Sequence, residues 1–275
     1  MSTAPMQVLR WTHGAGVAAK SDAVAQEEPL EIRVGGRSVA VVMRTPGHDR
    51  ELAAGFLLTE GVIHTAADLL DVLVCRDLPE GQSGNVVEAL LARPGEVDFA
   101  RLTRHVFSAS SCGLCGKATL DAVMQTFPPA APGPVFSPEM LGTLPGHLRS
   151  AQPGFDATGG LHASALFDIA GNLALVREDV GRHNALDKVL GAALFAGSLP
   201  LRAHGLLFSG RVSFELVQKA LAGGVPLVAG IGAPSTLAIE CARRGGQTLI
   251  GFLRPDRMNI YCGIERIAVG NSIKL

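Results

Sequence analysis

Two cysteines separated by two residues are the residues of this sequence best suited to chemistry. Cys112 and Cys115 lie in the run Ser110-Ser111-Cys112-Gly113-Leu114-Cys115-Gly116-Lys117, and the other three cysteines lie far away along the chain. A Cys-x-x-Cys pair serves as half of a zinc site, as a dithiol redox couple, or as a loop that carries one activated thiolate. The surrounding residues distinguish among these uses.

A zinc site needs two further ligands at a suitable spacing. Near the pair, only His105 is a candidate. A deaminase-type site requires His-x-Glu followed downstream by Pro-Cys-x-x-Cys. Here His162 follows the cysteines, and Ser164 stands where that Glu would be. Both the order and the missing acid argue against zinc chemistry of this type.

A thioredoxin-type couple would place the cysteines at a strand-to-helix junction. Here they follow the small polar run Phe107-Ser108-Ala109-Ser110-Ser111, which is typical of an exposed loop. An exposed thiolate suits exchange with a sulfur atom of another protein, and Lys117 and the start of a following helix would stabilise that thiolate. A reduced pair without a chemical role is the alternative.

A second notable stretch runs from Arg177 to Lys188 and contains six charged residues. It includes His183 and Asn184 and lies at the expected start of a helix. A helix start exposed to solvent would explain this composition. The density of hydrogen-bond donors and acceptors at a helix N-terminus also suits a binding site.

Three further segments each follow a predicted strand. They are Ser209-Gly210-Arg211, Ala233-Pro234-Ser235-Thr236 and Phe252-Leu253-Arg254-Pro255-Asp256-Arg257. Free N–H groups and helix dipoles converge where strands end and helices begin, and arginine binds phosphate in a forked geometry. These segments together predict a site for a phosphate-bearing ligand.

The pattern of apolar residues predicts the elements that position these motifs. After Thr158, strands alternate with helices of about ten residues, which predicts an α/β domain with parallel strands and helices on both faces of its sheet. The expected strands are 161–169, 173–176, 205–208, 225–229 and 248–253, and the expected helices are 184–196, 212–221 and 234–244.

The N-terminal part has a different pattern. It predicts a hairpin, 30–34 and 38–43, that turns on Gly35-Gly36, then a helix over 49–59 and strands at about 71–76 and 85–92. Residues 1–28 are expected to form a tail or an added strand. Helices are also expected over 119–127 and 138–150.

The clearest boundary is Pro128–Pro134, where four of seven residues are proline and regular structure is therefore excluded. We accordingly expect three parts: an N-terminal α+β unit, residues 1–105; the Cys-x-x-Cys loop and proline-rich connection, residues 106–136; and an α/β domain, residues 137–275.

Composition limits the class of protein. The chain has 275 residues, is 47% hydrophobic and has a net charge of −1, which favours a well-formed core and gives no indication of binding to nucleic acid or to a membrane. Five cysteines argue against a disulfide scaffold. We find no signal peptide and no membrane span, and expect a soluble cytoplasmic protein.

Five segments together resemble the FdhD family of formate dehydrogenase accessory proteins. The resemblance runs from about Val34 to Tyr261 in the family's order. The segments that carry it are Ser111-Cys112-Gly113-Leu114-Cys115-Gly116, Thr158-Gly159-Gly160-Leu161-His162, Glu178-Asp179-Val180-Gly181-Arg182-His183-Asn184-Ala185, Ser209-Gly210-Arg211 and Phe252-Leu253-Arg254-Pro255-Asp256-Arg257.

The resemblance implies a sulfurtransferase with a fold like that of cytidine deaminase. Such a protein would take sulfur from a cysteine desulfurase as a persulfide. It would pass the sulfur to the molybdenum of the bis(molybdopterin guanine dinucleotide) cofactor, its cargo, before that cofactor enters formate dehydrogenase. The resemblance also suggests a homodimer.

Carried over to this sequence, the persulfide would form on Cys112, with Cys115 as helper or alternative acceptor. The resemblance implies that the segment from Phe252 to Arg257 binds the guanine dinucleotide part of the cofactor. To this segment we add Ser209, Arg211 and His183 as further expected cofactor-binding residues. The set is Phe252, Leu253, Arg254, Pro255, Asp256 and Arg257, together with Ser209, Arg211 and His183.

Two other functions stay open at this point. A cofactor-binding chaperone without sulfur transfer would still mature its client when Cys112 is replaced by Ser. A general dithiol oxidoreductase would turn over small disulfides and would bind no guanine nucleotide.

Overall fold

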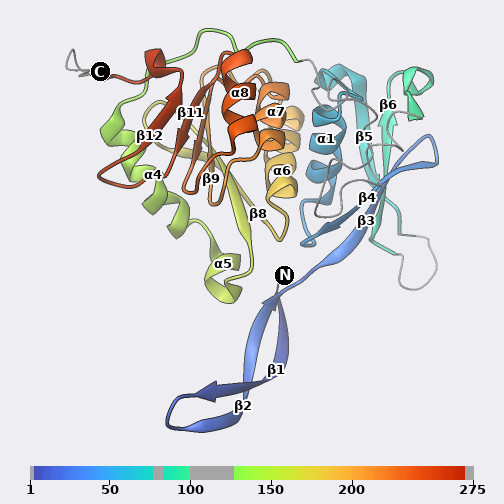
Figure 1. The fold of residues 1–275 in the computed structure, drawn as a ribbon. Helices are drawn as coiled ribbons and strands as arrows, with labels where there is room; N and C mark the ends of the chain where they lie inside the picture. Colours follow the sequence, from blue (N-terminus) through green and yellow to red (C-terminus); the bar gives the residue numbers. More distant parts are fainter. Residues whose placement is uncertain (1–2, 77–82, 100–126, 270–275) are drawn as a thin grey trace.

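The computed structural model describes residues 3–76, 83–99 and 127–269 (Figure 1). In this part of the chain the strands form a six-stranded, a four-stranded and a two-stranded sheet. The six-stranded sheet belongs to the C-terminal half, the four-stranded sheet lies beside it, and the two-stranded sheet projects away from both (Figure 1).

The six-stranded sheet has the order β12-β11-β10-β9-β7-β8. Its central strands β9, β10 and β11 are parallel, whereas β7 is antiparallel to β9. Each central strand is only four residues long and entirely buried, as expected for strands covered on both faces. The bounds are β7 His162–Phe167, β8 Leu173–Asp179, β9 Gly205–Phe208, β10 Leu227–Gly230, β11 Thr248–Gly251 and β12 Asn259–Cys262.

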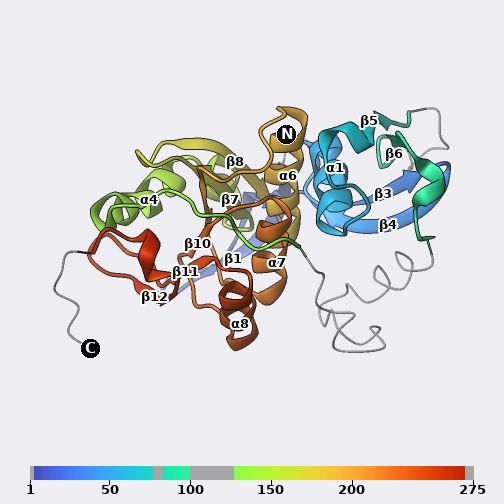
Figure 2. The same ribbon diagram turned by 90° about the horizontal axis from the view of Figure 1, so that it is seen from above.

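Helices cover both faces of this sheet (Figure 2). Neighbouring residues of β9 point to opposite faces, so Leu206 joins the core under α6, α7 and α8, while Leu207 joins the core under α4. The bounds are α4 Pro138–Ser150, α5 Pro153–Thr158, α6 Arg182–Phe195, α7 Phe214–Ala222 and α8 Thr236–Arg244.

The four-stranded sheet has the order β4-β3-β6-β5, and α1 packs on it. Its hairpin turns at Gly35 and Gly36, both with positive φ, as expected for a tight Gly-Gly turn. The bounds are β3 Glu28–Val34, β4 Arg37–Arg44, α1 Asp49–Thr59, β5 Leu69–Val74 and β6 Val86–Leu91, with short 3-10 helices at Ala66–Asp68, Pro94–Glu96 and Ile264–Arg266.

Helices α1 and α6 join the two units backbone to backbone. A Cβ atom added at Gly55 would lie 1.8 Å from the carbonyl oxygen of Asp187, and one at Gly191 would lie 1.8 Å from that of Glu51. Glycine at both positions therefore permits a close helix approach that any larger residue would prevent.

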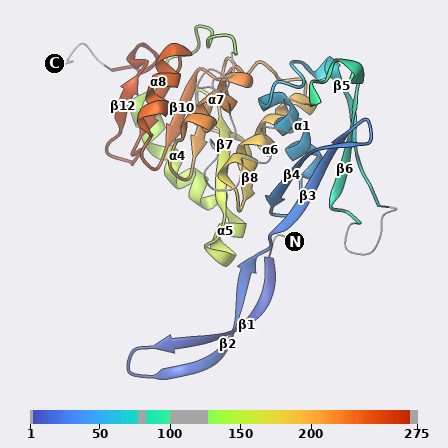
Figure 3. The same cartoon turned by 45° about the vertical axis from the view of Figure 1, so that its right-hand side comes forward.

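The two-stranded sheet is a hairpin arm formed by β1, Thr3–Thr12, and β2, Gly16–Ala25. It extends from the body beside α5 (Figures 1 and 3). The sequence predicted a tail or one added strand here, so the second strand is a finding of the structure, as are α5 and β12.

This architecture confirms the predicted α/β class, with a mixed sheet flanked by helices and a smaller N-terminal α+β unit. The division of the chain at residues 105 and 136 stays a prediction. Most of the helix expected over 119–127 lies outside the described residues. No helix in the described ranges has the length and apolar character needed to cross a membrane.

Candidate functional site

The predicted strand-end segments meet at one edge of the six-stranded sheet. Parallel β9, β10 and β11 all end at this edge, and antiparallel β7 begins there with His162. Ser209 continues β9: its N–H donates to the Ala163 carbonyl at 3.0 Å, and its Oγ accepts from the Ala163 N–H at 2.9 Å. The strand register therefore places Ser209 beside His162.

A cavity of about 540 Å³ opens at this edge. That volume lies within the range of about 300–1,000 Å³ common for small-molecule sites. Its walls come from the end of α4, from α5 and the loop that follows it, and from the ends of β9 and β10. The lining residues are Pro145, Arg149, Gln152, Phe155, Gly159, Gly160, Leu161, His162, Ser209, Gly210 and Ile231.

His162 is the half-buried titratable group of this cavity. Burial lowers the pKa of its imidazole, and the positive charges of Arg182, His183 and Arg211 lower it further. The ring is therefore neutral at neutral pH and is able to accept a hydrogen bond. A Cβ atom at Gly210 would lie 3.4 Å from His162 Nδ1, so glycine leaves space beside the ring.

Arg211 and His183 lie at the same edge but do not line the cavity. The exposed Arg211 is close enough to act electrostatically on His162. His183 Nε2 lies 2.9 Å from Glu215 Oε2 and 3.4 Å from Ser213 Oγ. The hydrogen bond from His183 lowers the pKa of the Glu215 carboxyl, so this pair links the first turns of α6 and α7.

The segment after β11 is held against the cavity wall by its backbone. Phe252 has φ = 51°, an unusual value for a residue other than glycine, and its side chain is 43% exposed. Its N–H donates to the Gly232 carbonyl at 3.0 Å, and the Leu253 N–H donates to the Gly230 carbonyl at 3.1 Å. Leu253 is completely buried, so it anchors the segment while Phe252 faces solvent.

Arg254 connects this segment to the cavity, because its Nη1 donates to the carbonyl of the lining residue Ile231 at 2.7 Å. Pro255, Asp256 and Arg257 are exposed. Asp256 and Arg257 form a loose pair at 3.7 Å. The Arg257 guanidinium is therefore accessible to an anion.

The charged run that begins at Arg177 is mostly turned inward. Glu178 accepts hydrogen bonds from Gly154 N and Phe155 N, each at 2.8 Å, and so satisfies the first turn of α5. Asp179 and Lys188 are 0% and 1% exposed and pair at 2.7 Å. These residues shape the site by fixing the backbone around it. Arg182, His183 and Asn184, at the helix start itself, stay partly exposed, so the solvent-exposed alternative holds only for the first turn of α6.

Sequence reasoning missed the wall contributed by α4 and α5. Gln152 is buried, and the Arg149 guanidinium lies 4.8 Å from the centre of the Phe155 ring. Arg149 also pairs with Asp156. No motif marks these residues. The Ser-Pro start of α4 was visible in the sequence, but the short α5 was not.

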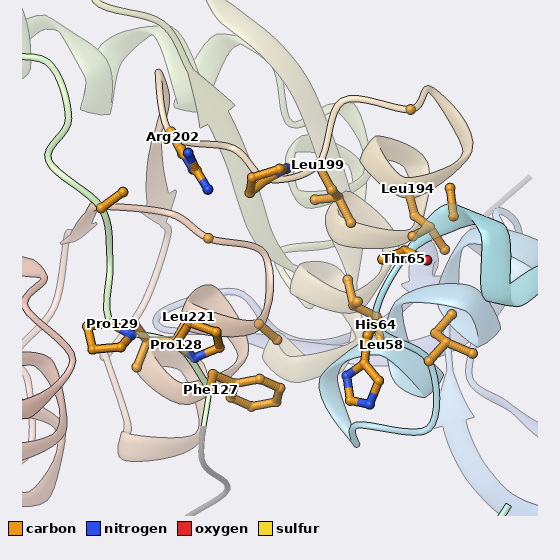
Figure 4. Close-up of a pocket in the computed structure, with 17 residues that line it drawn as sticks. Leu58, His64, Thr65, Phe127, Pro128, Pro129, Leu194, Leu199, Arg202 and Leu221 are labelled. Atoms are coloured by element: carbon orange, nitrogen blue, oxygen red, sulfur yellow. The ribbon is translucent and has the colours of Figure 1, made fainter. Parts of the chain in front are cut away.

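A second cavity, of about 500 Å³, lies between the two units (Figure 4). Phe127 and His64 lie toward one end and Arg202 toward the other, with mainly apolar side chains between them (Figure 4). Phe127 is the first described residue after the cysteine segment. Cys112 and Cys115 themselves lie outside the described residues.

In the ranges 3–76, 83–99 and 127–269, no three His, Cys, Asp or Glu residues gather where they could hold a metal ion. The edge instead offers arginines, a neutral imidazole and an exposed aromatic ring. Such groups suit a phosphate-bearing ligand with an aromatic base.

Comparisons with a family model and with individual proteins point to the same family. Residues 25–268 match the FdhD/NarQ family. The chain is 49% identical over 272 residues to the sulfur carrier protein FdhD of Streptomyces avermitilis, covering 96% of this chain and 95% of that protein. It is 50% identical over 273 residues to the protein of the same name from Mycolicibacterium paratuberculosis, covering 96% and 98% respectively.

The structure is similar to a crystal structure from Desulfotalea psychrophila of a protein provisionally described as a formate dehydrogenase accessory protein. The TM-score is 0.74 at 24% identity, and the match covers 97% of this chain and 100% of that chain. At this identity the match shows a shared fold.

Proposed function

This chain belongs to the FdhD/NarQ family, and on that basis we propose that it is a sulfurtransferase. It accepts persulfide sulfur from a cysteine desulfurase on Cys112. It passes this sulfur to the molybdenum of the bis(molybdopterin guanine dinucleotide) cofactor, its substrate, for use by formate dehydrogenase. The observation that carries the cofactor part of the proposal is the meeting of separate strand-end segments around one cavity.

The site supplies groups suited to the guanine dinucleotide portion of that substrate. Arg211 and Arg257 are exposed guanidiniums available to phosphate oxygens, and the Phe252 ring offers a surface on which a base can stack. His162 holds its neutral form and accepts a hydrogen bond from the ligand. Ser209 and Arg254 keep the ends of β9 and β10 in place.

The remaining cysteines favour the Cys-x-x-Cys pair as the sulfur carrier. Burial raises the pKa of Cys241 to about 11 and also raises that of Cys262. Because the thiolate is the nucleophile, both are poor acceptors of sulfur. Cys241 and Cys262 are thereby disfavoured, which leaves the half-buried Cys75 and the Cys112–Cys115 pair, and the family resemblance favours the pair.

The covalent chain allows the pair to reach the substrate. Cys115 precedes Phe127 by twelve residues, so the extended chain permits a separation of up to about 42 Å. A compact protein of this length has a radius of gyration of about 19 Å. The tether therefore does not confine the cysteines to the surface near Phe127.

The sulfur-transfer steps balance as thiol exchange. The Cys112 thiolate attacks the outer sulfur of the donor persulfide, a new S–S bond forms on Cys112, and the donor cysteine leaves as thiolate. Attack of the Cys115 thiolate on the inner sulfur of Cys112 then forms a Cys112–Cys115 disulfide and releases the outer sulfur as hydrosulfide toward the metal. A thiol reductant restores the pair, with its own two thiols oxidised to a disulfide.

The first test measures the intact mass of the protein after incubation with a cysteine desulfurase and cysteine. The wild type is expected to gain sulfur that a reductant removes, and Cys112→Ala is expected to gain none. Cys75→Ala is the matched control and should behave as the wild type. Absence of the gain in the wild type would refute sulfur carriage and favour a cofactor chaperone.

Comparison of Cys115→Ala with Cys112→Ala distinguishes one carrier from a shared pair. Retention of sulfur loading by Cys115→Ala identifies Cys112 as the carrier. Equal loss from both variants would contradict a single carrier.

The second test measures binding of guanosine diphosphate by calorimetry. Arg211→Met is expected to weaken binding about tenfold or more, because a charge-assisted phosphate contact contributes about 1.5–3 kcal/mol. Arg244→Met is the matched control, since Arg244 is an exposed arginine at the far end of α8. Turnover of small disulfides without any nucleotide binding would instead support a general dithiol oxidoreductase.

A further inference from the structure

The cavity at the edge of the six-stranded sheet has a buried amide side chain in its wall. Gln152 lies between α4 and α5, is 4% exposed and lines the cavity. Among the described residues, the side-chain amide of Gln152 has no hydrogen-bond partner. Burial of an amide without partners is costly, because its donors and its acceptor have lost water. Gln152 therefore holds unused hydrogen-bonding capacity at the wall of the cavity.

The local structure explains why this amide is free. Gln152 is the N-cap residue of α5, a position at which a polar side chain ordinarily accepts a hydrogen bond from the first turn. No such side-chain bond forms here. Glu178 instead accepts from Gly154 N and Phe155 N, each at 2.8 Å. The Gln152 backbone carbonyl still accepts from Asp156 N at 3.0 Å, but its amide has no task in the helix that it precedes.

His162 faces the same cavity with a further acceptor. Its neutral imidazole has one ring nitrogen without a proton. In the part of the chain that the structure describes, the ring has no hydrogen-bond partner. Gly210 keeps the space beside Nδ1 open, because a Cβ atom added there would lie 3.4 Å away. Together, Gln152 and His162 offer the cavity one amide that both donates and accepts and one imidazole that accepts.

The other walls of the cavity suit a flat ring. Pro145, Leu161 and Ile231 contribute apolar surface. Phe155 packs against the guanidinium of Arg149, which lies 4.8 Å from the centre of the phenyl ring. Aromatic rings and guanidinium groups both stack on planar ligands. A mainly apolar pocket with a few placed polar groups is the usual design of a small-molecule site, in which the polar groups determine specificity.

We propose that Gln152 recognises the hydrogen-bonding edge of a planar heterocycle in this cavity, and that this heterocycle carries a 2-amino-4-oxopyrimidine edge. Such an edge presents a carbonyl acceptor, a ring N–H donor and an amino donor in a row. The amide nitrogen of Gln152 donates to the carbonyl, and the amide oxygen accepts from the ring N–H, a bidentate pairing of the kind that amide side chains make with base edges. The amino group then donates to the acceptor nitrogen of His162.

This inference rests on the proposed function, whose substrate contains two kinds of ring with that edge, guanine and pterin. Phe252 does not line the cavity, and its side chain faces solvent. The ring that stacks on Phe252 and the ring that Gln152 recognises therefore occupy different positions. Two such positions fit a substrate with more than one planar ring.

Calorimetry with the full-length protein at pH 7 tests the inference and distinguishes the two rings. Guanosine diphosphate is compared with inosine diphosphate, and pterin with lumazine, because the second compound of each pair lacks the 2-amino group. Gln152→Met keeps the length of the side chain and removes the amide. It should weaken binding of the amino compound whose ring enters the cavity by about tenfold or more. Gln7→Met, at an exposed glutamine of β1, is the matched control and should bind as the wild type.

Gln152→Glu tests recognition of the edge itself. The two carboxylate oxygens accept hydrogen bonds but donate none, so they pair with the ring N–H and the amino group. This variant should retain the amino compound and bind its analogue without the amino group about tenfold or more weakly than the wild type does. A merely structural role of Gln152 would change both compounds alike.

The melting temperature of the ligand-free protein supplies an independent readout. Replacement of a buried amide that has no partner removes its desolvation cost, so Gln152→Met should melt at the wild-type temperature or above it. A fall of more than about 3 °C would show that the amide has a structural partner and would contradict the proposal.

Other results would overturn the proposal and leave the proposed function intact. They are an unchanged affinity of Gln152→Met for both amino compounds, and an equal loss of an amino compound and its analogue in Gln152→Glu. Failure of the wild type to bind either amino compound would instead refute the cofactor part of the proposed function, and this inference with it. Persulfide loading of Gln152→Met, measured as above, should equal that of the wild type, because the amide has no part in sulfur carriage.

Discussion

The buried ion pair between Lys188 of α6 and Asp179 of β8, with its hydrogen-bond partners, is called here the clamp, and replacement of Lys188 by Met tests how much it stabilises the fold. Lys188 Nζ lies 2.7 Å from Asp179 Oδ2 and donates to the carbonyl oxygens of Thr45 at 2.8 Å and Glu178 at 3.5 Å. All three donors of the ammonium group therefore have partners. The clamp connects α6 with β8 and with the loop that precedes α1.

Both carboxylate oxygens of Asp179 also have hydrogen-bond partners. Its Oδ2 accepts from Thr45 N at 3.1 Å, and its Oδ1 accepts from Gly181 N at 2.8 Å and from Asn184 Nδ2 at 3.0 Å. Lys188→Met leaves this buried carboxylate without its counter-charge. Breaking a buried pair in this way costs about 3–5 kcal/mol, a large part of the 5–15 kcal/mol that stabilises a typical domain.

The assay is urea unfolding followed by far-UV circular dichroism. Lys188→Met and Asp179→Asn should each lower the free energy of unfolding by about 3–5 kcal/mol. The double variant should cost about 2 kcal/mol less than the sum of the two, because it removes both charges. Arg244→Met is the control: it breaks an exposed pair with Glu240 and should change stability by no more than about 1 kcal/mol. A loss below about 1 kcal/mol in Lys188→Met, or strict additivity in the double variant, would refute the clamp.

Three further outcomes follow from the same contacts. Burial raises the pKa of Glu51, but the Arg177 hydrogen bonds outweigh this effect and bring the pKa to about 2 from the ordinary 4.5. The Glu51–Arg177 pair should therefore stabilise the fold above pH 4.5 by about 2 kcal/mol after allowance for solvent screening. In urea unfolding, the higher free energy of unfolding of the wild type over Glu51→Gln should vanish as pH falls from 4.5 to 2. Gly191→Ala should lower the free energy of unfolding by at least about 2 kcal/mol, because the added methyl group would meet the Glu51 carbonyl. Thermal unfolding measures this loss, and an unchanged melting temperature would contradict the close approach of α1 and α6. The lowered pKa of His162 means that its imidazole is half-protonated only below pH 6.5. Because an imidazolium cannot accept a hydrogen bond from the ligand, wild-type affinity for guanosine diphosphate, measured by calorimetry, should fall relative to His162→Asn as pH falls from about 7 to about 5. A constant ratio of the two affinities would exclude the acceptor role of this ring.

The sequence predicted elements well where apolar periodicity or turn residues are strong. The bounds of β9 and α1 agree with the expected ranges, and the Gly35-Gly36 turn closes the expected hairpin. Only one strand of the hairpin arm was expected. Its second strand, β2, is rich in alanine and lacks the alternation of polar and apolar residues along the chain that marks a half-buried strand. Its register becomes visible only when two strands are paired.

The candidate site was predicted in its strand ends and missed in its far wall. Ser209 and Phe252 could be placed because residues after parallel strands meet at one sheet edge. The contacts of Glu178 with Gly154 and Phe155 join residues more than twenty positions apart, and no local pattern encodes such a contact. The same reason hid the burial of Asp179, whose partners Thr45 and Lys188 are distant in sequence.

The clamp and the close helix contact make the cavity depend on the N-terminal unit. His162 and Asp179 are direct partners in the β7–β8 register, and Asp179 accepts from the backbone of Thr45 in the loop before α1. A displacement of that loop must therefore move the strand pair that carries His162. Phe99 and Phe127, which flank the cysteine segment, both pack against the core cluster that spans α1 and α6. The described residues that flank the cysteine segment, Phe99 and Phe127, and the wall of the His162 cavity are thus held by the same packing between the two units. If the proposed function holds, a substitution that loosens this packing should impair nucleotide binding and sulfur delivery together.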